Sequence, residues 1–263
     1  MDEGILRVFQ EHKEKLYLKT EIIGKPIVHF HRLNSTNDKA FNLALNNAKE
    51  GTCIITDIQT KGKGRMGRTW HSPAGGLYFS FILRPEIAPN KINLITLVFA
   101  VAIAKSLRKF GLNAKIKWPN DILIAQRKIC GILLEMDCEA DRIKFLIAGI
   151  GINNSTSHSE LTHNATSVYE ETGMKINNQD LLKETLENLD KYYLLFKKGQ
   201  TKRIIQEAKQ LSMLINKKVN LTIAKKTIAG KVVCFNTDCA IILKTKNSNT
   251  ERFLSADNLR VQN

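Results

Sequence analysis

Apolar residues recur at helical spacing in several segments of the chain and follow a strand-like pattern in most of the others. One segment comes directly after the helix-capping residues Asn34 to Asp38, and another ends at Gly111, a residue suited to a helix C-terminus. The predicted helices cover residues 39–49, 92–110, 181–197 and 201–211, with a short amphipathic helix at about 5–18. The predicted strands cover residues 28–30, 53–58, 77–83, 114–118, 128–137 and 143–152.

The pattern changes after about residue 214, where short strands alternate with polar turns. These strands cover residues 219–223, 227–235, 240–246 and 251–254. Such spacing is typical of a small all-β barrel, here of the SH3-like kind. The sequence therefore predicts a fold of the α/β class (α+β type), in which helices cover a mixed β-sheet. We expect a short N-terminal extension (1–27), a main domain (28–213) and a C-terminal barrel (214–263).

Composition places the chain among ordinary globular proteins of the cytoplasm. The 263 residues are 43% hydrophobic, which is enough for a normal core. No run approaches eighteen consecutive apolar residues, so we expect no transmembrane helix and no membrane association. The N-terminus lacks the pattern of a secretory signal. Five scattered cysteines without a C-x-x-C pair favour a reducing compartment over disulfides or a zinc site.

The formal net charge of +15 is large and indicates an anionic partner. The lysines are spread over the whole chain, with no block of five or more. The charge alone therefore leaves open whether that partner is a nucleic acid, a small anion or an acidic protein.

Residues 62–76 form the most distinctive segment, because glycines alternate there with lysine and arginine. Glycine lets a backbone approach a ligand closely, and the cations supply donors for phosphate or carboxylate. The segment contains the dinucleotide-binding pattern G-x-G-x-x-G, but that motif needs a helix to follow it. Pro73 and two adjacent glycines precede the strand at 77–83 instead, so we predict an anion-binding loop. A solvated hairpin loop is the alternative, and it explains the three cations poorly.

A second segment, Lys117 to Asp121, lies between two strand-like runs. Trp118 precedes a proline and should be extended. We expect Asn120 and Asp121 to fall in a loop, where they can address a base, a ribose or a magnesium ion. A plain type I turn explains the same residues.

A lysine and three glycines mark the next two strands. Lys128 stands at the mouth of an apolar strand, where its ammonium could hold a carboxylate, and Gly131 follows three residues later. Gly149 and Gly151 remove the side chains from one face of the strand at 143–152, which favours a flat ligand there. A solvated strand end is the common alternative for such a lysine.

Taken in order, these motifs resemble those of the biotin protein ligases, over roughly residues 28–260. Residues 62–75 read GKGRMGRTWHSPAG where the family typically has G-R-G-R-x-G-R-x-W-x-S-P-x-G. The K-W-P-N-D, R-K-x-x-G-I-L and G-x-G-I-N motifs are present at residues 117–121, 127–133 and 149–153, and S-T-N at 35–37. Two usual arginines are replaced, by Lys63 and Met66. Lysine keeps the charge but loses the bidentate fork.

The resemblance implies an ATP-dependent ligase with the biotin/lipoate ligase fold that forms biotinyl-5′-AMP and pyrophosphate. Biotin then passes to a lysine of a biotin carboxyl carrier protein such as that of acetyl-CoA carboxylase. Lys128 and Arg65 would be the catalytic residues, and Asp121 a Mg²⁺ ligand. The biotin-binding residues implied are Ser35, Thr36, Asn37, Gln59, Lys63, Gly64, Arg65, Lys128, Gly131, Gly149 and Gly151. Those implied for ATP or the adenylate are Arg65, Arg68, Trp70, Lys117, Asn120, Asp121 and Asn153.

The resemblance also bears on partners. Some relatives carry an N-terminal DNA-binding domain of about sixty residues, and only some 27 residues precede the matching region here, so we expect a ligase without specific DNA binding. The oligomeric state, including a homodimer, stays open. A lipoate or octanoyl transferase of the same fold and a nucleic-acid-binding protein are the alternative functions.

Overall fold

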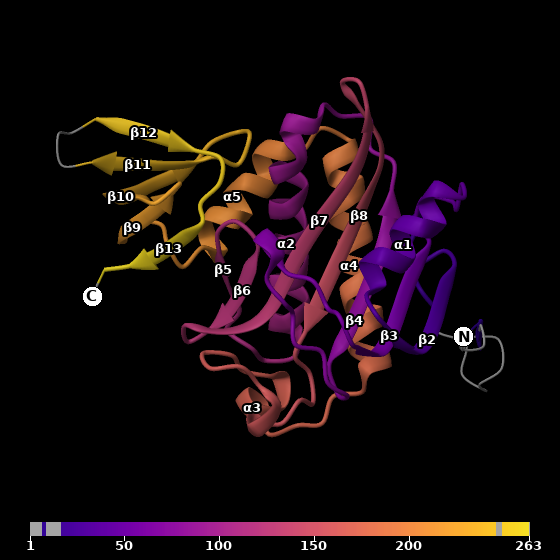
Figure 1. Cartoon of the computed structure of the whole chain (residues 1–263). Coiled ribbons are helices and arrows are strands. Elements are labelled where there is room, and N and C mark those ends of the chain that lie inside the picture. Colours follow the sequence, from indigo (N-terminus) through magenta and orange to yellow (C-terminus); the bar gives the residue numbers. More distant parts are fainter. Residues whose placement is uncertain (1–6, 9–16, 246–248, 263) are drawn as a thin grey trace.

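The computed structural model describes residues 7–8, 17–245 and 249–262, and its main feature is an eight-stranded mixed sheet (Figure 1). The strand order is β1-β2-β3-β4-β8-β7-β6-β5. Neighbouring strands are antiparallel except for β2 and β3, which are parallel. The strands are β1 (Arg7–Val8), β2 (Ile27–Leu33), β3 (Cys53–Gln59), β4 (Leu77–Leu83), β5 (Lys115–Lys117), β6 (Asp121–Ile124), β7 (Arg127–Glu139) and β8 (Arg142–Ile152).

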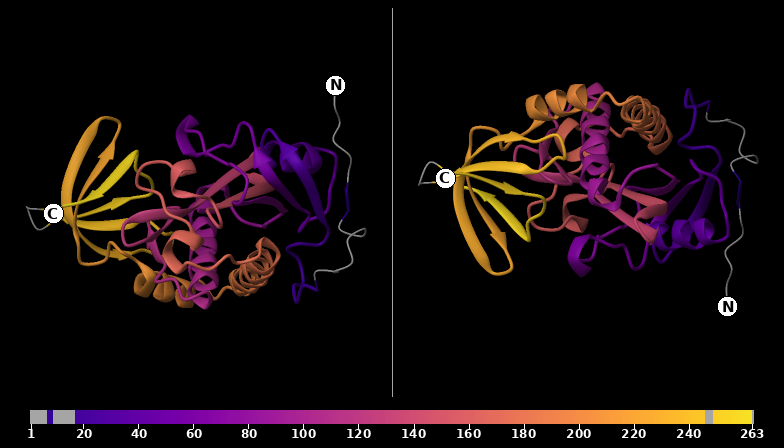
Figure 2. Two further views of the ribbon diagram at one scale, coloured as in Figure 1. Left: turned by 90° about the horizontal axis from the view of Figure 1, so that it is seen from below. Right: turned by 90° about the horizontal axis from the view of Figure 1, so that it is seen from above.

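Helices cover both faces of this sheet (Figures 1 and 2). The helices are α1 (Thr36–Leu45), α2 (Ile92–Lys109), α3 (Val168–Thr172), α4 (Asn178–Lys197) and α5 (Thr201–Leu211). Three short 3₁₀ turns lie at Arg65–Gly67, Pro89–Lys91 and His158–Glu160. The larger core packs α2, α4 and α5 against one face, where Phe79 and Phe81 of β4 point. The smaller core packs α1 against the other face, beside Ile82 and Phe145. Strand β4 is therefore buried on both sides along its whole length.

Helix α2 is long and apolar enough to span a membrane by length and composition, and most of it is buried in the fold. It contacts α4, α5 and the sheet, and thirteen of its eighteen residues are buried. Its hydropathy is therefore explained by its place in the larger core. Its C-terminus is followed by Gly111 in the left-handed region, as the sequence predicts.

The C-terminal segment forms a separate five-stranded antiparallel sheet in the order β12-β11-β10-β9-β13. Its strands are β9 (Lys218–Ile223), β10 (Lys226–Phe235), β11 (Ile241–Thr245), β12 (Thr250–Phe253) and β13 (Asn258–Val261). Side-chain hydrogen bonds tie this C-terminal unit to the rest of the protein. The buried Trp118 indole donates to the Cys239 carbonyl (2.8 Å), and the Asn93 amide donates to the Leu254 carbonyl (3.1 Å). Both the mixed sheet with its helices and the small β unit were predicted from the sequence.

Several details differ from the predictions. The expected helix at 5–18 falls mainly outside the described residues, and Arg7–Val8 within it form a short strand. Helix α1 begins at Thr36 rather than residue 39, because the Ser35 side chain caps it by accepting from the Asp38 N–H. Asp121 is the first residue of β6, where it pairs with Lys117, rather than a loop residue. The short elements β6, α3 and β13 were missed.

Candidate functional site

The glycine-rich segment connects β3 to β4 and folds back on itself as a narrow hairpin. The Trp70 N–H donates to the Gly62 carbonyl (2.9 Å), and the Gly64 N–H donates to the Arg68 carbonyl (2.7 Å). At the tip, Met66 and Gly67 both have positive φ. Strand β4 follows without an intervening helix, so the segment is not a dinucleotide-binding turn, as predicted.

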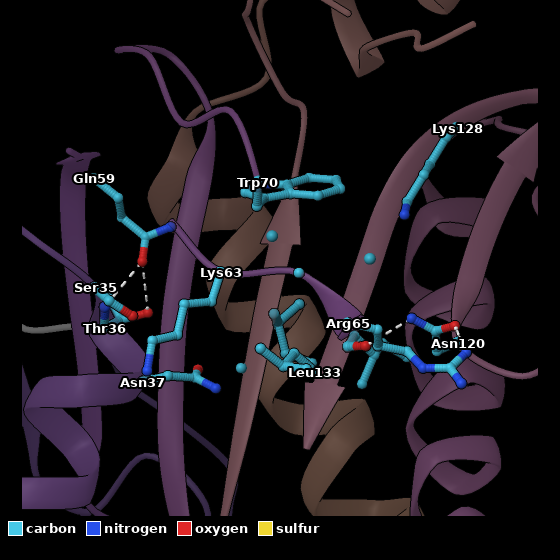
Figure 3. A pocket seen from close by; sticks show the side chains of 16 residues that line it. Ser35, Thr36, Asn37, Gln59, Lys63, Arg65, Trp70, Asn120, Lys128 and Leu133 are labelled. Carbon is cyan, nitrogen blue, oxygen red and sulfur yellow. Dashed lines mark hydrogen bonds between the residues drawn. The ribbon is translucent and has the colours of Figure 1, made fainter. Parts of the chain in front are cut away.

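This hairpin covers a pocket on the α1 face of the sheet (Figure 3). The empty space inside it, together with the solvent at its mouth, is about 450 Å³. Its walls come from the start of α1, the end of β3, the hairpin itself, Asn120 between β5 and β6, and strands β7 and β8. The lining residues are Ser35, Thr36, Asn37, Gln59, Lys63, Gly64, Arg65, Trp70, Asn120, Lys128, Gly131, Ile132, Leu133, Gly149, Ile150 and Gly151.

One end of the pocket is lined by uncharged hydrogen-bonding groups (Figure 3). The Gln59 Oε1 accepts from the backbone N–H (2.9 Å) and the hydroxyl (3.2 Å) of Thr36, while its amide donates to the Ser72 hydroxyl (2.9 Å). Ser80 Oγ lies 2.7 Å from Thr36 Oγ1 and 2.6 Å from Asn37 Oδ1. Gln59 is half-buried and the other four residues are buried, and these groups hold one another in fixed orientations.

The network continues from Asn37 into charged residues at the pocket rim. The Asn37 amide donates to Glu135 Oε2 (2.6 Å) on β7. The Lys63 ammonium contacts the Asp38 carboxylate and lies 3.5 Å from Glu135 Oε1. Lys63 was predicted as part of an anion clamp, and here its charge is matched by two carboxylates from α1 and β7.

The opposite end of the pocket is cationic (Figure 3). The Lys128 Nζ lies 2.7 Å from Asp121 Oδ1, across the paired strands β6 and β7. Arg65 Nη1 donates to Asn120 Oδ1 (2.9 Å), and the Asn120 amide donates to the Ile132 carbonyl (2.9 Å). Burial lowers the pKa of the Arg65 guanidinium below its ordinary value, with Asp121 acting in the opposite direction. A desolvated cation of this kind gains when an anion enters.

Trp70 lies between the two ends, against the strand face that lacks side chains. A Cβ on Gly151 would lie 2.6 Å from the indole Cε2, and a Cβ on Gly131 would lie 3.0 Å from Cζ3. The Lys128 ammonium sits 5.1 Å from the ring centroid. Gly149, in turn, makes room for the Asn37 amide. Trp70 and Asn37 therefore occupy part of the space beside these glycines, which also line the pocket, and a flat ligand against this strand face stays a prediction.

Two neighbouring cavities share Trp70 and Lys128 with this pocket. One is bounded by His71, Asn153 and residues 160–162; there the Asn153 amide donates to the Thr166 carbonyl (2.9 Å). The other lies between the hairpin, Lys117 to Asp121, and residues 256–259 of the C-terminal unit. Arg68 closes it by donating to the Asp257 carbonyl (3.2 Å). All the predicted ATP-site residues thus line one of three adjoining cavities.

The Mg²⁺ assignment rests on Asp121 alone. Its carboxylate is paired with Lys128, and no group of three or more His, Cys, Asp or Glu side chains suited to a metal occurs in the part of the chain that the structure describes. The residues present therefore do not form a resident metal site, and Mg²⁺ coordination by Asp121 stays a prediction.

Sequence reasoning missed three residues that complete the site. Ser80 is a polar residue in the middle of the apolar run 77–83, a signal that was available. Ser72 receives the Gln59 hydrogen bond from inside the hairpin motif. Glu135 gave no signal, because its partners Asn37 and Lys63 are distant in sequence.

Comparisons with known proteins show the family of the chain. Residues 29–153 match the biotin/lipoate A/B protein ligase family. The chain is 36% identical over 255 residues to the bifunctional ligase/repressor BirA of Bacillus subtilis, covering 94% of this chain and 78% of that protein. It is 34% identical over 125 residues to the biotin–[acetyl-CoA-carboxylase] ligase of Paracoccus denitrificans, covering 46% of this chain and about half (52%) of that protein.

Among solved structures, the fold is similar to the biotin protein ligase from Aquifex aeolicus in complex with biotin and ATP. The TM-score is 0.78 at 28% identity, over 90% of this chain and 100% of that one. The match to the Bacillus protein along most of both sequences carries the assignment. The chain therefore belongs to the biotin/lipoate A/B protein ligase family.

Proposed function

We propose that the chain is an ATP-dependent biotin protein ligase. It would activate biotin as biotinyl-5′-AMP and transfer it to a lysine of a biotin carboxyl carrier protein, such as that of acetyl-CoA carboxylase. The names of the Paracoccus and Aquifex relatives, and the biotin and ATP bound to the latter, support this choice within the family.

The observation that carries the proposal is the chemical difference between the two ends of the pocket. Biotin has a neutral ureido ring with two N–H donors and a carbonyl acceptor at one end, and a carboxylate at the other. Gln59, Thr36 and Asn37 offer matching uncharged groups at one end, and Lys128 and Arg65 offer cations at the other. This difference would fix the orientation of biotin in the pocket, because a carboxylate placed among the amide groups would lose its hydration without gaining a countercharge.

In the first step a biotin carboxylate oxygen would attack the α-phosphorus of ATP. A new P–O bond forms, the bond to the β,γ-diphosphate breaks, and pyrophosphate leaves. The attack brings two anions together, so fixed cations should supply most of the catalysis. Lys128 would neutralise the carboxylate and then the phosphate, and Arg65 would contribute a charge from the hairpin side.

In the second step the ε-amine of the carrier lysine would attack the carbonyl carbon of the mixed anhydride. The amide bond forms, the C–O bond to AMP breaks, and the amine loses a proton. The hairpin covers the pocket and would exclude water, which otherwise hydrolyses the anhydride. Trp70 and Asn153 would contact the nucleotide in the cavity beside the pocket, with Asn120, Lys117 and Arg68 on the other side.

Biotin-dependent ATP–pyrophosphate exchange tests the proposal without a carrier protein. The purified chain should exchange with biotin and not with lipoate, and Lys128→Ala should reduce exchange by at least about a hundredfold, as for loss of a preorganised charge. Lys128→Arg, which keeps the charge, is the matched control and should retain part of the activity. Exchange with lipoate only would assign the chain to the lipoate branch of the family. Absence of exchange with either would refute the proposed enzyme.

A further inference from the structure

Three lysines form a row across the exposed face of the C-terminal sheet. In the strand register, Lys231 of β10 lies directly opposite Lys218 of β9 on one side and Lys244 of β11 on the other. All three side chains are exposed, while the adjacent residues Val219, Val232 and Leu243 are buried in the core of the unit. With strands about 4.8 Å apart, the lysine row spans about 10 Å.

Stability does not explain the lysine row, because like charges directly opposite one another destabilise a sheet. Protection of sheet edges against aggregation is a frequent reason for lysine in strands. Here the edges are β12 and β13, and the row lies on the three inner strands. No ion pair with any of the three lysines occurs among the described residues.

The rest of this face is also basic. The outward positions of β12 and β13 include Arg260 and Arg252, of which Arg252 is ion-paired with Asp238, and the other outward positions of the sheet are Asn, Thr, Ala, Val, Cys or Ile. None of the described outward positions of the five strands is a carboxylate or an aromatic residue. The face therefore suits a negatively charged surface, and it offers no ring on which a nucleic-acid base could stack.

The position of the face relates it to the candidate site. Strand β13 begins at Asn258, which lines the cavity that holds Arg65 and Lys128. At the other end of the strand, the Gln262 N–H donates to the Lys218 carbonyl (2.9 Å). Four residues of strand separate these points, or about 13 Å. A domain of about 100 residues has a radius of gyration of about 13 Å, so one bound protein domain can contact both places.

We propose that the lysine row is a docking surface for the acceptor protein, which would present an acidic surface to it while its target lysine enters the neighbouring cavity. This inference rests on the proposed function, since it assigns the partner of the same site. Electrostatic docking outside the pocket would act on the association rate and on KM for the acceptor, and not on the chemistry with biotin and ATP.

The test replaces all three lysines of the row by glutamate in the full chain. The probe is the purified, unbiotinylated carrier domain of an acetyl-CoA carboxylase. We expect pyrophosphate exchange to stay within about twofold of wild type, and KM for the carrier domain to rise at least about tenfold at low salt, with a weaker salt dependence. A triple Lys→Arg variant of the row should keep the wild-type KM.

The matched control carries Lys198→Glu, Lys202→Glu and Lys209→Glu, three exposed positions at the end of α4 and on α5. It makes the same change in net charge away from the row, and its KM for the carrier should stay near wild type. Should the triple glutamate variant fail to fold by circular dichroism, Lys231→Gln alone should raise KM by about two- to threefold.

Two results would overturn the inference: an unchanged KM in the row variant, or an equal rise in the control. Loss of binding to duplex DNA with an unchanged carrier KM would assign the surface to nucleic acid and likewise overturn it. Absence of biotin-dependent exchange in the wild type would instead refute the proposed function, so the two failures are distinguishable.

Discussion

Replacing Gly149 by alanine should destabilise the fold through a single neighbour, the Asn37 amide. Gly149 lies in β8 between Ser80 of β4 and Leu133 of β7. A Cβ added there would lie 2.7 Å from Asn37 Cγ and closer still to its Oδ1. The nearest atoms around this Cβ all belong to Asn37. The amide would therefore have to move by about an ångström or more to reach ordinary contact distance.

The cost follows from the hydrogen bonds that this movement breaks. Asn37 is 4% exposed and Ser80 is fully buried, so neither gains water in exchange. The contacts to Ser80 Oγ and Glu135 Oε2, both 2.6 Å, would be lost or strained. Each buried group left unpaired costs about 1–3 kcal/mol, and removal of a strand glycine returns about 0.5–1 kcal/mol. We expect a net loss of about 2–3 kcal/mol, or a Tm lower by about 4–12 °C.

A double-mutant cycle measures this effect by thermal unfolding of wild type, Gly149→Ala, Asn37→Ala and the double variant. Truncation of Asn37 removes the obstructing amide, so Gly149→Ala should be neutral, or stabilising by about 0.5–1 kcal/mol, in that background. The interaction energy between the two sites should then be about 2–4 kcal/mol. Equal destabilisation by Gly149→Ala with and without the Asn37 side chain would refute the reasoning.

Three further predictions concern other parts of the molecule. The hydrogen bond to Asp38 raises the pKa of Lys63 in the folded protein. The bridge therefore contributes its full stability below the ordinary lysine pKa of about 10.4, and this contribution is lost as the pH rises through the higher pKa of the folded state. Lys63→Met should therefore flatten the fall in Tm above about pH 10; an unchanged Tm–pH curve would contradict this. The buried Asp190 carboxylate accepts hydrogen bonds from the three backbone N–H groups of residues 21–23 at 2.7–2.9 Å. Asp190→Ala should therefore lower the free energy of unfolding in urea by at least about 3 kcal/mol. A loss below about 1 kcal/mol would contradict this prediction. Burial raises the pKa of the Cys53, Cys130 and Cys239 thiols, whereas Cys138 is exposed. Cys138→Ser should therefore remove the fastest phase of labelling by a thiol reagent at neutral pH. If that phase persists, another thiol is the reactive one.

Local patterns predicted most of the secondary structure, because periodicity and turn residues act over a few positions. Strand Leu77–Leu83 and helix Thr201–Leu211 have the predicted limits. Short elements were not predicted, because a periodic pattern needs several residues to become visible. Strand β6 has four residues and α3 has five, too few for a period to show. Asp121 was placed in a loop because Pro119 and Asn120 signal a turn, and the turn is shorter than that signal suggested.

The residues that the sequence singled out for a site lie close together in the fold, and their binding roles stay predictions. The motif residues gather around one pocket and its two neighbouring cavities, as their resemblance to a ligand site implies. Their contacts could not be predicted, since a hydrogen bond such as Asn37 to Glu135 joins residues 98 positions apart. The same limit explains the glycines. A side chain missing from a strand signals that something packs there, and only the fold shows that Trp70 and Asn37 are what packs.

The pairing within the pocket bears on how a ligand would bind. At each end, the hydrogen-bonding or charged groups are paired with protein groups of the same chemical kind as the matching part of biotin. Amide and hydroxyl groups bond one another at the neutral end, and the Asp121 carboxylate holds the Lys128 ammonium at the cationic end. A biotin carboxylate would therefore replace one carboxylate by another, so Lys128 need not be stripped of a full water shell when substrate arrives. Because burying an unpaired charge is costly, such an exchange would keep the half-buried Lys128 ammonium paired and oriented between turnovers.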